Sequence, residues 1–384
     1  MATTESVTLR LEALRKDLFS CSRCGFCRIW DWKGVNWVCP TYPYTEAYDT
    51  QYARGRVAMA QQYLSGNAQV KERFLEHLTE CTLCGSCAVH CPVGMPLVEI
   101  WQAFRSDLVD AGLVYAPHQR VVNNIGQYHS IFEPLPSKEA TRPAEGRKVD
   151  VLYFPGCQTN RKARAIGKAT TDLLAKLKVD FAVLEEDACC GYPLWDIGQM
   201  EAMRANAAHT VAAIEAYQPQ VVLTTCAGCY RALKDVYPNL QLPLHAQVQH
   251  IHDFFTARQP AKMATIARKV TYHDPCILGR HMGLYDQPRA AISSLPGVEL
   301  TEMYSHREHA LCCGAGGGVL GAFDDLAAHV AVERLQQAAS AGAEQLVTSC
   351  PTCVVNLKRA VRRAGVNLVV TDIVELLNEA VQDA

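Results

Sequence analysis

The second half of the chain alternates short apolar runs with longer segments in which apolar residues recur at helical spacing. The apolar runs predict six strands: Val149–Phe154, Phe181–Leu184, Gln220–Thr224, Val270–His273, Val298–Met303 and Gln345–Thr348. The helically spaced segments predict four helices: Arg161–Lys178, Gln199–Tyr217, Leu326–Ser340 and Thr352–Ala364. Such alternation is typical of a parallel sheet with helices on its faces. We therefore expect two α/β lobes, at residues 149–260 and 268–384.

The first third of the chain has a different pattern. Residues 48–80 are rich in Ala, Gln, Leu and Met, and Leu75 and Leu78 are spaced like one face of a helix. This favours a largely helical domain at 1–133. Pro and charged residues then replace the periodic apolar ones, which predicts a linker at 134–148. The expected fold class is α+β and multidomain.

Composition and charge exclude several classes of protein. Of the 384 residues, 49% are hydrophobic and 20% are charged, which is typical of a folded globular chain. The formal charge of −2 lacks the excess of positive charge that is typical of nucleic-acid-binding proteins. There is no apolar stretch of 18 residues and no apolar leader at the N-terminus. We expect a cytoplasmic protein without a membrane span, in contact with an inner membrane only through a partner.

Cysteine is the exceptional residue, with 18 copies. They fall into groups of four, four, five and five: 21, 24, 27, 39; 81, 84, 87, 91; 157, 189, 190, 226, 229; and 276, 312, 313, 350, 353. Disulfide-dense scaffolds are normally small and secreted, whereas this chain is long enough to build cores without staples. The clustering therefore favours metal centres.

The second group reads Cys-x2-Cys-x2-Cys-x3-Cys-Pro, the pattern in which three thiolates hold one [4Fe-4S] cluster and the fourth ligates another. The first group repeats it, but with eleven residues before Cys39-Pro40. Crossing the fourth ligands gives site 1 (Cys21, Cys24, Cys27 and Cys91) and site 2 (Cys39, Cys81, Cys84 and Cys87). The alternative, a pair of zinc knuckles, does not need the third Cys or the Cys-Pro ending.

The eleven residues 28–38 that lengthen the first group contain three of the five Trp of the chain. Trp offers a large apolar body with one polar N–H. Two interpretations are open: the rings shield a cluster from water, or they form a docking patch for a partner.

The third and fourth groups belong to an internal repeat. Cys157 pairs with Cys276, Cys189-Cys190-Gly191 with Cys312-Cys313-Gly314, and Cys226-x2-Cys229 with Cys350-x2-Cys353, at separations of 119, 123 and 124 residues. Most of these Cys follow predicted strands, where open α/β sheets place their ligands. Five thiolates per lobe exceed what a cubane or tetrahedral zinc requires, and adjacent Cys pairs suit neighbouring irons of an extended cluster. We name the lobe centres site 3 (Cys157, Cys189, Cys190, Cys226 and Cys229) and site 4 (Cys276, Cys312, Cys313, Cys350 and Cys353).

Glycines follow each Cys pair. Gly191 and Gly314 would let the backbone turn sharply beside the sulfurs. Gly316-x-Gly318-x2-Gly321 formally matches a dinucleotide fingerprint, but it follows a Cys pair rather than a strand and lacks a clear acidic residue further on. We therefore interpret Gly316 and Gly317 as places where the backbone approaches a cluster closely, and expect no flavin or NAD on this chain.

These spacings resemble the cysteine-rich CCG domains of heterodisulfide reductase. The order of two ferredoxin-type quartets and then two such Rossmann-like, pseudo-symmetric lobes is similar to the D-type subunit of the membrane-type enzyme. The resemblance implies cubane [4Fe-4S] clusters at sites 1 and 2 and noncubane [4Fe-4S] clusters at sites 3 and 4, with a disulfide cleaved between the latter. Iron–sulfur subunits of glycolate, lactate and glycerol-3-phosphate dehydrogenases share this architecture.

His273, in the stretch Tyr272-His273-Asp274-Pro275-Cys276, could donate a proton to a departing thiolate. A hydrogen bond to a ligand and a plain strand-end His are equally compatible with its position.

Two hypotheses about function follow. In the first, the chain is an oxidoreductase. Its noncubane clusters, held by ten cysteines, reduce or form a disulfide or thiol substrate. In the second, the same clusters only relay electrons from a flavoprotein dehydrogenase or bifurcating partner to a quinone or another acceptor. Both require other redox subunits, such as a flavoprotein or a membrane cytochrome.

Overall fold

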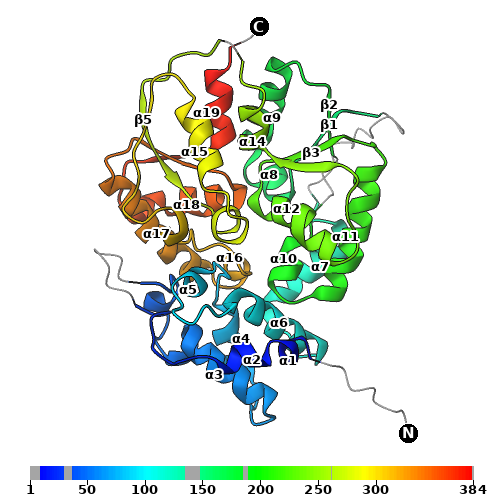
Figure 1. Ribbon diagram of the computed structural model, residues 1–384, viewed down its shortest axis with the longest axis vertical. Coiled ribbons are helices and arrows are strands. Elements are labelled where there is room, and N and C mark those ends of the chain that lie inside the picture. The colour runs from blue at the N-terminus through cyan, green and yellow to red at the C-terminus, as the bar shows by residue number, and fades with distance from the viewer. Residues whose placement is uncertain (1–8, 30–36, 135–147, 185–188, 261, 383–384) are drawn as a thin grey trace.

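The computed structural model describes residues 9–29, 37–134, 148–184, 189–260 and 262–382. A helical domain, built from the N-terminal third, lies at one end of the molecule (Figure 1). Two α/β lobes lie side by side above it in this view, and the chain ends at the top of the second lobe. Among the helices that the structure describes, none is both long and apolar enough to cross a membrane.

The helical domain is assembled around α6. Its elements are α1 (Arg10–Ala13), α2 (Arg15–Phe19), η1 (Tyr42–Tyr44), η2 (Asp49–Gln51), α3 (Ala53–Leu64), α4 (Glu72–Thr79), α5 (Ser86–Val89), α6 (Leu97–Asp110), η3 (Ala116–His118) and α7 (Gln119–Tyr128). The α6 helix is buried along almost its whole length, with Trp101 and Phe104 in the core of the domain. A helix that is buried all round packs against neighbours on every side, so α6 links the helical domain to both lobes.

The first lobe has a four-stranded parallel sheet in the order β2-β1-β3-β4. Its strands are β1 (Val151–Phe154), β2 (Phe181–Val183), β3 (Val221–Thr224) and β4 (Gln247–His250). Its helices are α8 (Cys157–Arg161), α9 (Arg164–Lys176), α10 (Tyr192–Asp196), α11 (Met200–Glu215), α12 (Ala227–Arg231), the π-helical turn η4 (Ala232–Val236), α13 (Tyr237–Asn239) and α14 (Ile251–Thr256). The central strands β1 and β3 are fully buried because helices cover both faces.

The second lobe repeats this plan with the order β6-β5-β7-β8. Its strands are β5 (Arg268–His273), β6 (Val298–Leu300), β7 (Gln345–Thr348) and β8 (Val369–Asp372). Its helices are the π-helical turn η5 (Ile277–His281), α15 (Asp286–Ser293), η6 (Arg307–His309), α16 (Val319–Ala322), α17 (Asp324–Ser340), α18 (Pro351–Ala364) and α19 (Ile373–Ala380). The mixed helix and sheet architecture, with two parallel sheets, agrees with the expected fold class.

The structure corrects several predicted elements. The helix predicted at Arg161–Lys178 is α9, which begins only at Arg164 because Ala163 lies outside the helical region of backbone conformation. The edge strands β4 and β8 were not predicted, since each alternates exposed and buried residues over only four positions. The predicted strand Val298–Met303 ends at Leu300. The predicted linker falls mostly on residues 135–147, outside the described part of the chain.

The two lobes meet through helices that the repeat relates to each other. The α9 helix of the first lobe packs against α19 of the second, and α14 packs against α15 (Figure 1). Each pair joins a helix after the first strand of one lobe to a helix after the fourth strand of the other. Their apolar side chains share one core with Tyr153 and Tyr272. The lobes are thus arranged with approximate two-fold symmetry.

The strand order places the cysteines at the point where the sheet connections reverse direction. In each lobe the second strand lies on one side of the first and the third strand lies on the other. Ligands in such sheets bind at the carboxyl ends of the strands that flank this reversal. Cys157 and Cys226 follow β1 and β3, and Cys276 and Cys350 follow the corresponding β5 and β7.

Candidate metal centres

The thiols of site 1 line one cavity of the helical domain. The lining includes all four of the predicted cysteines: Cys21, Cys24, Cys27 and Cys91. Gly25 adopts a left-handed conformation (φ +83°) that lets the chain turn tightly between Cys24 and Cys27. Cys24 is exposed, whereas Cys27 is partly buried. Site 1 therefore reaches the molecular surface.

The thiols of site 2 line a second cavity, closer to the lobes. Its lining includes the other four cysteines of the helical domain: Cys39, Cys81, Cys84 and Cys87. Trp101 and Val98 of α6 form one wall. Cys39 and Cys84 are buried, so this site is more shielded from water than site 1. The structure thus groups each Cys triplet with the Cys-Pro cysteine of the other motif.

The four thiols that line each cavity suit the binding of a positively charged metal centre. Burial raises the pKa of Cys27 to about 11, and burial together with neighbouring thiols raises the pKa of Cys87 well above its usual value. Crowded thiols of this kind remain neutral when no positive charge is present. Soft thiolate ligands select iron–sulfur clusters or zinc, and metal binding keeps the thiolates deprotonated. The residues therefore fit a thiolate-bound metal cluster.

The five cysteines of site 3 are buried together above β1 and β3. The sulfurs of Cys157 and Cys189 are 3.9 Å apart. The thiol of Cys190 neighbours those of Cys189 and Cys229, and the thiol of Cys229 also neighbours that of Cys226. The repeat motif therefore converges on one location, as its position in the sheet predicts.

Polar side chains hold the Cys189-Cys190 turn in place. The Nδ2 of Asn206 donates to the carbonyl of Cys189 at 2.7 Å, and the hydroxyl of Tyr237 donates to the carbonyl of Cys190 at 3.1 Å. The N–H of Gly191 points at the Cys189 sulfur at 3.4 Å. A Cβ on Gly191 would lie 2.7 Å from the sulfur of Met203, so only glycine fits this turn.

Site 4 has the same construction in the second lobe. Cys312 neighbours Cys276 and Cys313, and Cys313 neighbours Cys353. The N–H of Gly314 (φ +90°) points at the Cys312 sulfur at 3.3 Å. N–H groups aimed at sulfur stabilise negative charge there, which is how proteins tune iron–sulfur centres.

His273 ends β5 and faces site 4. Its ring nitrogen and the sulfurs of Cys313 and Cys353 all lie within 4.8 Å of one another. The Nε of Arg334 donates to Nδ1 of His273 at 3.0 Å, so the ring proton is on Nε2. At the corresponding position the first lobe has Phe154. Sites 3 and 4 therefore differ by one imidazole.

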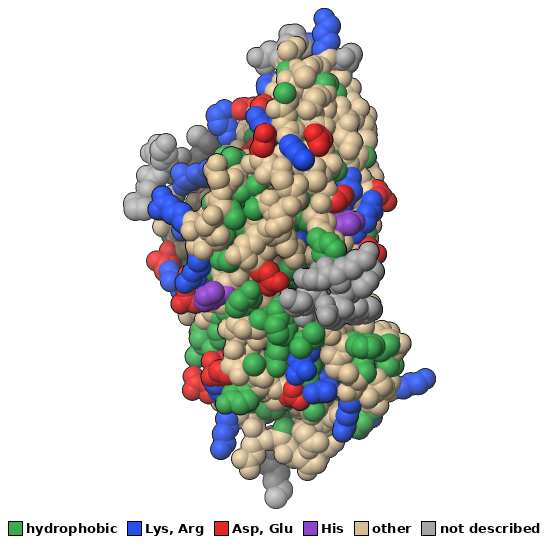
Figure 2. Space-filling view, turned by 90° about the vertical axis from the view of Figure 1, so that its left-hand side faces the viewer, with side chains coloured by type: hydrophobic (Ala, Val, Ile, Leu, Met, Phe, Trp, Pro, Cys, Tyr) green, Lys and Arg blue, Asp and Glu red, His purple; other side chains and the backbone are tan. Residues whose placement is uncertain are grey.

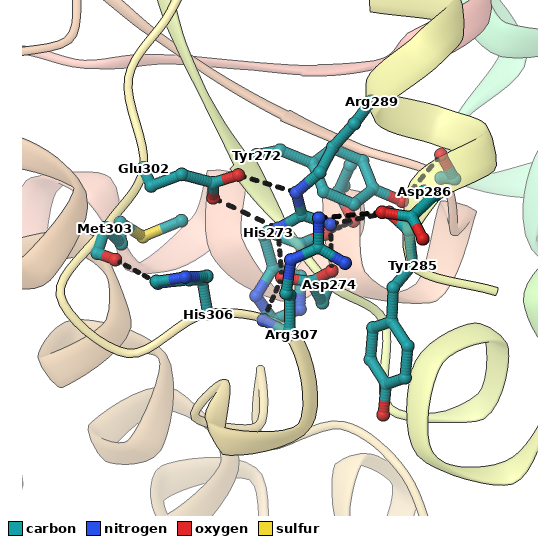
Figure 3. Close-up of polar contacts among 12 residues, drawn as sticks. Tyr272, His273, Asp274, Tyr285, Asp286, Arg289, Glu302, Met303, His306 and Arg307 are labelled. Carbon is teal, nitrogen blue, oxygen red and sulfur yellow. Dashed lines mark hydrogen bonds and ion pairs between the residues drawn. The ribbon is translucent and has the colours of Figure 1, made fainter. Parts of the chain in front are cut away.

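A network of charged side chains positions the loop that carries Cys276 (Figure 3). Arg289 donates to both carboxylate oxygens of Asp274, at 2.7 and 3.0 Å, and also to Glu302. The backbone N–H of Arg307 donates to Asp274 as well. Burial opposes ionisation of Asp274, but the hydrogen bonds and charge of Arg289 outweigh it and lower the pKa of this carboxyl. The carboxylate thus fixes the turn before Cys276.

The two lobe sites adjoin each other. The thiol of Cys226 in site 3 neighbours that of Cys350 in site 4, and each is the first cysteine of its Cys-x2-Cys turn. Both follow the third strand of their lobe. The approximate two-fold symmetry therefore brings equivalent cysteines face to face at the lobe boundary.

Site 2 in turn adjoins site 4. Cys84 lies within hydrogen-bonding distance of Cys312, and both pack with Cys276 and the side chain of Ile277. The His281 ring lies 2.9 Å from the carbonyl of Leu83, on the same loop as Cys84. Sites 2, 4 and 3 thus form a series of neighbours, with site 4 between the helical domain and site 3.

Gly316 and Gly317 lie at the junction of the three domains. A Cβ on Gly317 would be 2.2 Å from the carbonyl oxygen of Cys81, and one on Gly316 would be 2.7 Å from that of Thr82. The N–H of Gly317 donates to Asp196 at 3.0 Å. These glycines therefore allow close docking of the site 2 loop onto the second lobe.

Arg105, which the sequence did not single out, joins the same three domains. Its guanidinium donates to the carbonyls of Leu78, Cys81, Asp196 and Gly317 at 2.7–2.9 Å. Asn206 and Arg280 were also missed. These positions have no signal in the sequence, because each acts on backbone far away along the chain.

The Trp-rich insert lies largely on residues 30–36, outside the described residues, although Trp37 packs against Tyr42 at 5.9 Å between ring centroids. Hydrophobic side chains gather on the helical domain in the lower part of Figure 2. Seven described large hydrophobic residues of this domain are exposed: Phe19, Phe26, Ile29, Tyr44, Tyr48, Val89 and Val93.

Two family models match the chain. A cysteine-rich domain matches residues 151–234 and 270–358, and a 4Fe-4S dicluster domain matches residues 17–95. The chain is 36% identical to the D-type subunit of dihydromethanophenazine:CoB–CoM heterodisulfide reductase from Methanosarcina mazei, over 95% of this chain and 94% of that protein. It is 26% identical to the EtfAB:quinone oxidoreductase of Syntrophomonas wolfei, over 80% of this chain and 47% of that protein. A hypothetical protein of Helicobacter pylori shares the fold, with a TM-score of 0.60 at 10% identity, over 86% of this chain and 67% of that one.

Proposed function

Since this chain belongs to the family of D-type heterodisulfide reductase subunits, whose members are oxidoreductase subunits, we propose that it reduces a disulfide substrate, or forms one, between site 3 and site 4. It is an iron–sulfur protein that works within a larger redox complex. The proposal assigns cubane [4Fe-4S] clusters to sites 1 and 2 and noncubane clusters to sites 3 and 4.

The observation that carries this proposal is the contact between Cys226 and Cys350. Cleavage of a disulfide R–S–S–R′ takes two electrons and two protons and yields two thiols. A site for this reaction must hold two sulfur atoms about a bond length apart and then separate them. Two equivalent metal centres that face each other can each hold one of the sulfurs. When bound, the clusters would supply iron for the substrate sulfurs and deliver the electrons one at a time.

The residues of this chain supply geometry and shielding. Buried strands β1, β3, β5 and β7 fix the cysteines that follow them. The hydrogen bonds of Asn206, Tyr237 and Asp274 prevent the ligand turns from shifting. All ten lobe cysteines are buried, so water is largely excluded from the reacting sulfurs.

The contacts between sites also favour one order of electron transfer. Site 1 has the exposed cysteine, site 2 adjoins site 4 through Cys84 and Cys312, and site 4 adjoins site 3. Electrons from a partner would then pass from site 1 to site 2 and reach site 4 before site 3. The exposed hydrophobic residues of the helical domain favour this domain as the place where a redox partner binds.

The proposal includes His273, whose Nε2 is buried beside site 4 without a hydrogen-bond partner among the described residues. Its Nε2 proton faces site 4 because Arg334 occupies Nδ1. The same proton is placed to assist the protonation of a thiolate product beside site 4.

A second function is supported by the similarity to the EtfAB:quinone oxidoreductase. In this alternative the same four sites relay electrons between a flavoprotein partner and a quinone-linked acceptor, and no substrate reacts on this chain. The series of adjoining sites serves either function.

Replacement of one lobe ligand separates the two functions. With reduced benzyl viologen as donor, and either the CoM–CoB heterodisulfide or cystamine as probe, Cys350→Ser should lower turnover at least 100-fold while the cubanes remain reducible by dithionite. Thr352→Ala, within the same Cys-x2-Cys turn, is the matched control and should retain turnover. Disulfide reduction that persists in Cys350→Ser would favour the relay.

A further inference from the structure

The boundary between site 2 and site 4 contains the positive charge of a partly buried arginine, Arg280. Arg280 lies on η5, four residues after Cys276. Its Nε donates to the carbonyl of Cys84 at 2.6 Å, and its Nη1 donates to the carbonyls of Glu308 and Ala310 at 3.1 and 2.7 Å. One side chain thus connects the ligand loop of site 2 to the second lobe.

The remaining nitrogen of this guanidinium is not used by the protein. Nη2 of Arg280 is buried and has no hydrogen-bond partner. The carbonyl that Nε contacts belongs to Cys84, whose side chain packs with those of Cys276 and Cys312. The three cysteines belong to two different sites, so the charge acts on both.

We propose that Arg280 is a positioning residue that clamps the Cys84 loop against site 4 and whose charge raises the reduction potentials of sites 2 and 4. The inference rests on the proposed assignment of clusters to these sites. A cluster becomes more negative when it gains an electron, and a nearby cation stabilises that state in a medium of low dielectric constant. Electrons from site 1 would accordingly be drawn toward site 4.

The internal repeat supplies a natural comparison. The position of Arg280 in the second lobe corresponds to Arg161 in the first lobe, because both lie four residues after the first ligand cysteine of their lobe. Arg161 ends α8 and, like Arg280, is partly buried. The sequence therefore places an arginine in both lobes, but only that of the second lobe donates to a cysteine carbonyl of the helical domain.

The test is a potentiometric titration of the full chain, monitored by EPR, with iron content measured for every variant. Arg280→Gln should lower the reduction potentials of sites 2 and 4 relative to that of site 1. The expected change is at least tenfold in the equilibrium for electron transfer from site 1, which is about 59 mV for one electron. Arg280→Lys keeps the charge and should remain near the wild-type potentials. Arg161→Gln is the matched control and should leave sites 2 and 4 unchanged.

Equal shifts in Arg280→Gln and Arg280→Lys, or no shift in either, would overturn the proposal. If Arg280→Gln loses its clusters, Ile277→Glu provides the test, because Ile277 packs against the same three cysteines. A carboxylate there must lower the same potentials, and unchanged potentials would also overturn the proposal. These measurements use no substrate, so they remain decisive even if the chain proves to be a relay.

Discussion

The sulfur of Cys226 lies beside that of Cys350 across the boundary between the two lobes. The two cysteines are equivalents within the internal repeat, separated by 124 residues. Because α9 and α14 pack against α19 and α15, the same helix pairs that join the lobes also set this separation. A duplicated metal-binding lobe has therefore produced a pair of sites that face each other, which neither lobe could form alone.

Docking of the helical domain depends on the absence of a side chain at Gly317. We predict that Gly317→Ala destabilises the protein by about 3 kcal/mol, because its Cβ would lie 2.2 Å from the carbonyl oxygen of Cys81. Electron transfer from site 2 to site 4 should slow in parallel. Chemical denaturation and stopped-flow reduction would measure the two effects.

Gly342→Ala is the matched control for this prediction. Gly342 also has a left-handed backbone (φ +68°), but a Cβ there would meet only the end of the Lys269 side chain, at 3.9 Å. It therefore reports backbone strain without a clash. Similar losses in both variants would show that strain, and not docking, causes the effect at Gly317.

A buried carboxyl at the same junction makes stability depend on pH. Burial raises the pKa of Asp196 to about 7, well above the value of an Asp in an unfolded chain. Folding then takes up a proton, so this contribution to stability is complete below about pH 4 and is lost as the pH rises to about 7. Asp196→Asn mimics the protonated form and can still accept from the N–H of Gly317.

We therefore predict that Asp196→Asn stabilises the protein more at pH 8 than at pH 6, by about 1 kcal/mol. Thermal unfolding at the two pH values measures this difference. Asp325→Asn, at a side chain that is 86% exposed, should show no such difference. An equal effect of Asp196→Asn at both pH values would contradict a raised pKa at this position.

The imidazole beside site 4 distinguishes it from site 3. Replacing His273 by Phe, the residue at the corresponding position of the first lobe, removes the N–H that faces Cys313. We predict that His273→Phe lowers the reduction potential of site 4 relative to site 3, since a hydrogen bond to a ligand sulfur stabilises the reduced cluster. EPR-monitored titration checks the change, and Phe154→Leu should leave site 4 unaffected.

The sequence alone predicted the parts of the fold that depend on local pattern. The strands β1 and β3 are nearly continuous apolar runs, whereas β5 and β7 mix apolar with polar residues. All four were found from the alternation of short runs with helical segments. The edge strands β4 and β8 were missed, since four residues that alternate between exposed and buried do not distinguish a strand from a loop. The start of α9 at Arg164 was also missed, because a single residue, Ala163, causes it.

The grouping of the thiols followed from cysteine spacing, but the arrangement of the groups did not. Spacing predicts which thiols can converge, and the cavities of the helical domain group them in the same way. The contact between Cys84 and Cys312 depends on how two domains pack, and no local pattern encodes it. Gly317 was interpreted as a residue that approaches a cluster, and a Cβ built on it would meet the backbone of the site 2 loop at Cys81. Tertiary packing decided both points.

The most direct test of a disulfide reaction between sites 3 and 4 is low-temperature EPR of anaerobically purified, oxidised protein, recorded with and without a small thiol such as 2-mercaptoethanesulfonate. The proposal predicts a new paramagnetic signal that requires the thiol, is absent from Cys350→Ser, and broadens when the iron is enriched in ⁵⁷Fe. Spectra that do not change with thiol, in protein whose cubanes are reduced normally by dithionite, would contradict it.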